Sequence, residues 1–248
     1  MQDVELVERF SILGDWKGAT PKVTRVLIGV VFDIVEGFFG KKLDRPVLIT
    51  NYPSADHPVA CYAIKDGCYQ VNLSVSSGLN WCQIVYQLAH ELCHLNSNYA
   101  ESVGHKYKWL EESLCEMCSV AVLVVLGKRW DKTGMYKYGR KYGASVRKYV
   151  ESLPSMKGYM PENTSAYAIW FDSNVSALEG NSEIRELNGV VASYLYKNVF
   201  SVCPAAWCCV GALNKWDCHQ DLTFTSYKES WREQCGDSVE VNEILNFL

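Results

Sequence analysis

Two histidines and a glutamate near the middle of the chain have the types and spacing of a metal site that activates water. His90 and His94 are four residues apart, and a helix places such residues on the same side, one above the other. Two neutral imidazoles at about 2.0–2.1 Å from a metal would form two corners of a tetrahedral zinc site. Glu91 lies next to the first histidine, where its carboxylate can take a proton from a metal-bound water and pass it to a leaving group. The pattern predicts zinc ligands at His90 and His94 and a catalytic base at Glu91.

Helical periodicity places both histidines away from the apolar side of the helix expected over residues 80–95. At about 100° per residue, one side of this helix gathers Trp81, Ile84, Val85, Leu88, Leu92 and Leu95. His90 and His94 fall at about 200° and 240° from Leu88, so they face a cleft or solvent instead of the core. The alternative is a coincidence on a solvated helix face, and random placement would give the three-residue pattern in roughly one such sequence in 150.

A catalytic zinc site needs a third protein ligand, and the next expected helix, over residues 109–126, offers three glutamates. Glu112 and Glu116 lie about 40° apart on one side of this helix, and Glu111 falls off to one side. The opposite side is apolar, with Leu110, Leu114, Met117, Ala121 and Val125. His105 is the nearest further histidine, but it lacks the spacing of a third histidine ligand. The better candidates for the third ligand are therefore on this second helix.

The two segments together resemble a known group of enzymes. HELCH at residues 90–94 and WLEESLCE at residues 109–116 look like the gluzincin group of zinc metallopeptidases. In that group the third ligand is a glutamate on a second helix, often within W-L-x-E-G-L-A. The resemblance therefore implies a zinc ion held by His90, His94 and Glu112, with Glu111 as the runner-up for the third ligand.

The match has departures and one further correspondence. Ser113 stands where glycine is common in the group, and Cys115 stands where alanine is common. Glu116, one turn after Glu112, matches the acidic residue that often supports a histidine ligand from behind. The resemblance thus implies a supporting role for Glu116.

The resemblance also covers a β-hairpin that precedes the motif. Cys61–Ile64 leads into Lys65-Asp66-Gly67, and the chain returns along 68–75 with alternating apolar and polar residues. The resemblance implies that the return strand is the cleft-edge strand, which binds an extended substrate by β-addition. It spans about residues 60–126, and the rest of the chain shows no further match.

The remaining patterns predict an α+β fold. Pro21–Phe39 is apolar at helical spacing, and Pro46–Thr50 has the character of a short strand. Residues 1–20 are weakly patterned, whereas the second half of the chain is mostly helical. We therefore expect a zincin-like catalytic domain over 1–130, with a small mixed sheet, and a mostly helical subdomain over 131–248 that completes the cleft.

Composition narrows the class of protein and its surroundings. The 248 residues carry a net charge of -4, which gives no electrostatic reason to expect nucleic acid or an anionic membrane as a partner. The start of the chain lacks the pattern of a secretory signal, and eleven cysteines then suggest reduced, buried thiols in a cytoplasmic protein. A second, structural zinc is conceivable at Cys115 and Cys118, or at Cys203, Cys208, Cys209, Cys218 and His219, but the spacings favour thiols.

The leading functional hypothesis is a zinc metallopeptidase that hydrolyses peptide or protein substrates. One alternative is a zincin-like binding or regulatory module without activity, and another is a zinc hydrolase of a non-peptide amide or ester. A residue that steadies the oxyanion is not identified by the pattern among 15 tyrosines. Tyr159 and Tyr167 lie at plausible distances downstream, but we expect both to be packing residues. The sequence gives no indication of oligomeric state.

Overall fold

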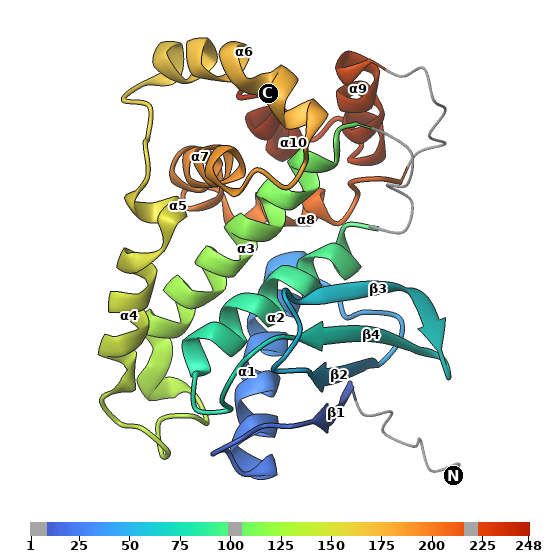
Figure 1. Cartoon of the computed structure of the whole chain (residues 1–248). Helices are drawn as coiled ribbons and strands as arrows, with labels where there is room; N and C mark the ends of the chain where they lie inside the picture. Colours follow the sequence, from blue (N-terminus) through green and yellow to red (C-terminus); the bar gives the residue numbers. More distant parts are fainter. Residues whose placement is uncertain (1–8, 99–105, 216–222) are drawn as a thin grey trace.

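The computed structural model describes residues 9–98, 106–215 and 223–248, which form a small sheet and many helices (Figure 1). The strands are β1 (Phe10–Gly14), β2 (Val47–Asn51), β3 (Val59–Lys65) and β4 (Cys68–Leu73). The helices that accompany the sheet are α1 (Pro21–Phe39), α2 (Trp81–Asn96) and α3 (Lys108–Arg129). The rest comprises η2 (Trp130–Lys132), α4 (Tyr142–Ser152), α5 (Pro154–Lys157), α6 (Thr164–Gly180), α7 (Arg185–Leu195), the π-helical turn η3 (Tyr196–Phe200), η4 (Pro204–Ala206), α8 (Trp207–Val210), α9 (Phe224–Gln234) and α10 (Val239–Leu245). The α+β class is as expected.

Local signals account for the boundaries of α1 and of the hairpin. The Thr20 side chain accepts a hydrogen bond from the backbone N–H of Val23, and Pro21 occupies the first turn of α1. Gly40 ends the helix in the left-handed conformation, with φ of 65°. In the hairpin, Asp66 and Gly67 both have positive φ, 52° and 74°, as a two-residue turn that matches the twist of its strands requires.

The sheet order differs from the expectation for the hairpin. The strands are arranged β1-β2-β4-β3, in which β1, β2 and β4 are parallel and β3 is antiparallel to β4. The expectation that the return strand forms the edge is wrong, because β2 pairs with β4 along its whole length, from Val47 opposite Tyr69 to Asn51 opposite Leu73. The outgoing strand β3 is therefore the edge strand on the side of the hairpin.

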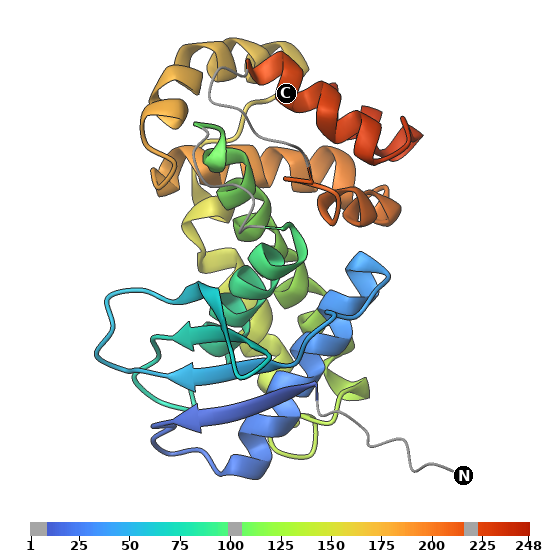
Figure 2. The same ribbon diagram turned by 90° about the vertical axis from the view of Figure 1, so that its right-hand side faces the viewer.

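Helices cover the sheet and extend the core well beyond it. Figure 2 shows α1 and α2 against one face of the sheet, with α6, α9 and α10 at the opposite end of the molecule. The long helix α3 packs against α2, α4 and α7. The core is continuous across the predicted boundary at residue 130, from Leu88 of α2 through Leu123 of α3 to Val191 of α7. None of the helices in the described ranges is both long enough and apolar enough to cross a bilayer.

A pair of hydrogen bonds fixes α2 against the end of β4. The Gln87 side chain accepts from the backbone N–H of Ser74 at 2.9 Å and donates to the backbone carbonyl of Ser74 at 3.0 Å. The side-chain amide of Gln87, which is buried, thus pairs with both the N–H and the C=O of Ser74, as the backbone of a neighbouring strand would. Because Gln87 lies one turn before His90, this contact sets the depth and rotation of the helix that carries both histidines.

Candidate metal centre

Side chains from α2 and α3 converge where the two helices pack against each other. The Nε2 atom of His90 lies 3.3 Å from Oε2 of Glu112, and the Nε2 atom of His94 lies 3.5 Å from Oε1 of Glu112. Two ligands of one tetrahedral zinc, each bonded at about 2.0–2.1 Å, would be roughly 3.3 Å apart. Each oxygen of the Glu112 carboxylate therefore lies from one of the two imidazoles at the distance that separates two ligands of one zinc.

These three side chains are partly accessible to solvent and electrostatically coupled. Their side-chain exposures are 19% for His90, 13% for His94 and 31% for Glu112. Burial opposes protonation of His94, but its hydrogen bond to Glu111 and the charges of Glu112 and Glu111 raise its pKa to about 10. Burial opposes ionisation of Glu112, but the hydrogen bond to His90 and the charge of His94 lower its pKa to about 2. At neutral pH and without a metal, a carboxylate therefore faces an imidazolium.

Glu111 and Glu116 occupy different positions from those implied by the resemblance. Glu111 is buried, and its Oε1 atom lies 2.7 Å from Nδ1 of His94, on the side of the ring away from Glu112. Glu116 accepts a hydrogen bond from the hydroxyl of Tyr86. Helices α2 and α3 run antiparallel. The residue one turn after Glu112 on α3, which is Glu116, therefore faces the residue one turn before His90 on α2, which is Tyr86. The carboxylate that contacts a histidine from behind is thus Glu111, and the role expected for Glu116 is corrected accordingly.

A thiol also belongs to the cluster. The ligand atoms of His90, His94 and Cys115 all lie within 4.8 Å of one another, so this group could hold a metal ion. Cys115 is completely buried, and this burial raises the pKa of its thiol. The sequence predicts a buried thiol at Cys115, at a position where the group commonly has alanine. A thiol one turn after a glutamate ligand is the signal that could have marked it as a second possible donor.

Glu91 lies beside the cluster without a protein partner among the described residues. It is only 3% exposed, yet within the described ranges its carboxylate has no hydrogen bond or ion pair. Its charge acts on His94 and also on Cys61 of β3, whose thiol pKa is raised by burial and by this charge. The Glu91 carboxylate is therefore close enough to act on both His94 and the edge strand of the sheet.

The other residues considered from sequence are not assigned to this cluster. Tyr159 is exposed, whereas Tyr167 is buried in a stack with Tyr194, with ring centroids 4.0 Å apart. His105, Cys218 and His219 lie outside the described residues. Every cysteine in the described part of the chain is a thiol.

Comparisons of the chain with protein-family models, with curated proteins and with solved structures find no match. The contacts described above define the candidate centre: two imidazoles, the Glu112 carboxylate and the Cys115 thiol, with the buried Glu91 carboxylate near them.

Proposed function

We propose that this chain is a zinc-dependent peptidase of the gluzincin type, with a zincin-like arrangement of α2, α3 and the sheet. His90, His94 and Glu112 hold the zinc, and Glu91 is the catalytic base. The observation that carries the proposal is the Glu112 carboxylate, whose two oxygens lie 3.3 and 3.5 Å from the two Nε2 atoms. Nitrogen and oxygen donors at this spacing suit zinc.

Exposure favours Glu112 over Cys115 as the third ligand. A catalytic zinc has three protein ligands and keeps one position open to water or substrate. Glu112 is the most exposed member of the cluster, whereas Cys115 is completely buried on the inner side of α3. A site completed by Glu112 therefore leaves its open position on the side that solvent reaches.

The protein side chains supply the proton transfers. When bound, zinc lowers the pKa of a coordinated water to about 7 and polarises a carbonyl oxygen. Glu91 accepts the proton of the attacking water and delivers it to the nitrogen of the leaving amine. Its burial and its lack of a protein hydrogen-bond partner in the described ranges keep the carboxylate oxygens available for this exchange.

The edge strand β3 favours a peptide over other amides and esters. An unpaired strand edge presents backbone N–H and C=O groups that an extended peptide can bind. Val59 and Ile64 of this strand have exposed apolar side chains, which offer apolar contacts to such a peptide. Glu91 lies close to Cys61 of the same strand, so a peptide bound there would pass the catalytic base.

A second candidate function follows from Cys115. If both Glu112 and Cys115 bound the metal together with the histidines, four protein ligands would close the site. The protein would then be a zinc-containing binding or regulatory module without hydrolytic activity. The two functions differ in whether the bound metal keeps a position that water occupies.

Removal of the metal tests the proposed function. We expect about one zinc per chain, and we expect cleavage of a mixed peptide library to stop after treatment with a chelator and to resume when zinc is added back. Mass spectrometry of the products and elemental analysis of the same preparation provide both measurements. Cleavage that persists in the metal-free protein would contradict the proposal, and bound zinc without any cleavage would favour the regulatory module.

Zinc affinity is expected to fall as the pH is lowered. The raised pKa of His94, about 10, means that the metal-free protein holds a proton there throughout the range from pH 7 to 9. Zinc binds only the neutral imidazole, so this proton must leave on binding. The apparent affinity should therefore rise by at least about tenfold per pH unit across this range, with one proton released from His94 and up to one more from the zinc-bound water. Calorimetric titrations in buffers of different ionisation enthalpy measure the proton count, and a pH-independent affinity would contradict the coupling.

A further inference from the structure

Asn214, more than a hundred residues from the histidines in sequence, reaches the candidate metal centre from the C-terminal part of the chain. It follows α8 and adopts the left-handed conformation, with φ of 61°, which asparagine tolerates better than most residues. Its Nδ2 group donates to Oε2 of Glu111 at 2.8 Å and to the backbone carbonyl of Ser97 at 3.1 Å. Its Oδ1 atom accepts a hydrogen bond from the hydroxyl of Tyr227, on α9, at 2.9 Å.

These contacts form an uninterrupted chain of side chains that ends at a proposed zinc ligand. Tyr227 bonds to Asn214, Asn214 to Glu111, and Glu111 to Nδ1 of His94 at 2.7 Å. Glu111, Asn214 and Tyr227 are 3%, 2% and 1% exposed. In such a shielded environment hydrogen bonds are strong, and leaving one of these groups unpaired is costly.

The chemistry of each group fixes the direction of the chain. A carboxylate only accepts, so the NH₂ group of Asn214 must face Glu111 and its carbonyl oxygen must face the Tyr227 hydroxyl. The second oxygen of Glu111 is then left to accept from His94, which places the ring proton on Nδ1. The Nε2 atom of His94, which faces Glu112, is therefore the one available to bind a metal.

We propose that Asn214 and Tyr227 are positioning residues for the metal centre: they hold Glu111 so that it fixes the orientation and tautomer of His94. This inference rests on the proposed function, in which His94 is a zinc ligand. Partners of this kind orient ligating histidines and raise their basicity. The C-terminal helices thereby contribute to metal binding through residues that do not touch the metal.

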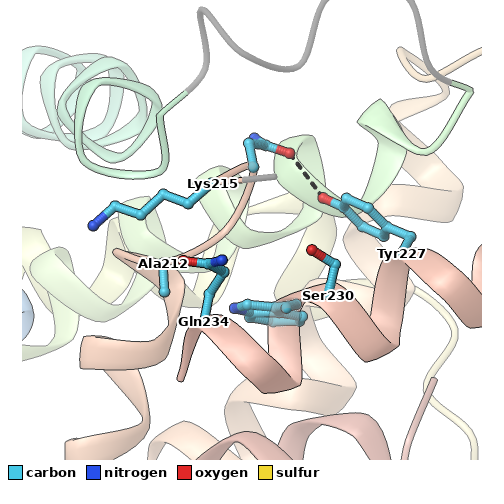
Figure 3. A pocket seen from close by; sticks show the side chains of 7 residues that line it. Ala212, Lys215, Tyr227, Ser230 and Gln234 are labelled. Atoms are coloured by element: carbon cyan, nitrogen blue, oxygen red, sulfur yellow. Dashed lines mark hydrogen bonds between the residues drawn. The ribbon is translucent and has the colours of Figure 1, made fainter. Parts of the chain in front are cut away.

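Figure 3 shows the outer end of this chain, where the Tyr227 hydroxyl makes its hydrogen bond at the wall of a small pocket. Lys215, Ser230 and Gln234 line this pocket beside Tyr227. Tyr227→Phe keeps the ring and removes only the hydroxyl, so it breaks the outermost link of the chain, the hydrogen bond to Oδ1 of Asn214.

A second asparagine offers a matched control. Asn98, at the end of α2, also has a positive φ, 58°, and donates to the backbone carbonyls of Gly211 and Leu213 at 3.2 and 2.8 Å. Asn98 thus anchors residues 211–213, which directly precede Asn214, to the end of α2 without a contact to Glu111. Substituting glycine at either asparagine permits the left-handed backbone and removes the side chain with its amide. Both variants loosen the docking of the segment, but only Asn214→Gly breaks the chain to His94.

The test measures the zinc dissociation constant of the full-length protein by competition with a chromophoric chelator. We expect Asn214→Gly to weaken zinc binding by roughly ten- to hundredfold, and Tyr227→Phe to weaken it by a smaller factor, because Glu111 keeps its bond to Asn214. Asn98→Gly and Tyr167→Phe, which removes a buried hydroxyl elsewhere, should leave it unchanged. The proton resonance of the His94 Nδ1–H should shift in Asn214→Gly and persist in Asn98→Gly, which loss of docking alone would not produce.

The outcomes separate the two proposals. Tight binding of zinc by both the wild type and Asn214→Gly would overturn the positioning role and leave the proposed function intact. Equal losses of zinc affinity in Asn214→Gly and Asn98→Gly would show that docking of the C-terminal part, and not the chain to His94, controls zinc binding. That result would also overturn the positioning role. A wild type that binds no zinc would refute the proposed function and this inference with it. If Asn214→Gly fails to fold, an unchanged zinc affinity in Tyr227→Phe overturns the inference.

Discussion

Replacing Glu91 with glutamine is expected to lower peptide hydrolysis by a factor of about 10² to 10⁴ while the zinc stays bound. Glutamine keeps the shape of the side chain, which matters because Glu91 is buried beside His94. An amide cannot accept the proton of the attacking water, so the chemical step loses its base. The effect should appear in kcat, because Glu91 is assigned to proton transfer and not to substrate binding.

The measurement combines kcat on a fluorogenic peptide with the zinc content of the same sample. Glu179→Gln is the control, because it removes the same charge from an exposed ion pair with Lys106 at 2.6 Å, and its activity should equal that of the wild type. Unchanged hydrolysis in Glu91→Gln would show that Glu91 is not the base. Loss of zinc together with activity would show that Glu91 acts on the metal site instead.

The sequence was most informative where a single helix determines the geometry. The relation between His90 and His94 depends only on the period of α2, and the element bounds needed to place them were predicted within a few residues. The two oxygens of Glu112 lie 3.3 and 3.5 Å from the two imidazoles, and its role as the third ligand stays a prediction. Its distance from them depends on the packing of two helices, which periodicity alone does not give.

Predictions that required the relative direction of two elements were less successful. The antiparallel packing of α2 and α3 places Glu111 behind His94 and directs Glu116 to Tyr86. Which residue of α2 a glutamate on the next turn of α3 contacts depends on the direction in which α2 runs relative to α3. Spacing along one chain segment contains no such information.

The sheet shows the same limit. The first strand, Phe10–Gly14, has only Phe10 buried, so it lacks the alternation that identifies a strand in sequence. It forms because β2 offers a parallel partner from Val47 to Asn51. The choice of β3 instead of β4 as the edge likewise depends on pairing with β2, a contact distant in sequence.

The contribution of the C-terminal helices could not be anticipated from any motif. Asn214 and Tyr227 reach Glu111 across more than a hundred residues, and neither belongs to a recognisable pattern. The only local hint at Asn214 is that asparagine is a residue that adopts positive φ. Buried polar side chains of this kind become interpretable only when their hydrogen-bond partners are known.

Glu112→Gln is expected to weaken zinc binding by more than about a hundredfold, because removing a charged ligand should cost more than disturbing its supporting partners, for which ten- to hundredfold is typical. Glutamine keeps the size of the side chain and its contacts on α3, so the fold should be retained. Zinc affinity from chelator competition, with the far-ultraviolet circular dichroism of both proteins, measures the two effects separately. Equal zinc affinity in Glu112→Gln and the wild type would contradict the assignment.

Cys115→Ala distinguishes the open site from the closed one. If Glu112 is the third ligand, Cys115→Ala should keep both zinc and hydrolysis, and the cobalt-substituted wild type should lack a thiolate-to-metal charge-transfer band. If Cys115 binds the metal as well, that band should be present in the wild type and absent from Cys115→Ala, and the variant should bind zinc more weakly. Four protein ligands would leave no position for water, so the second result would favour the regulatory module. The buried Glu91 carboxylate would then have no metal-bound water from which to take a proton.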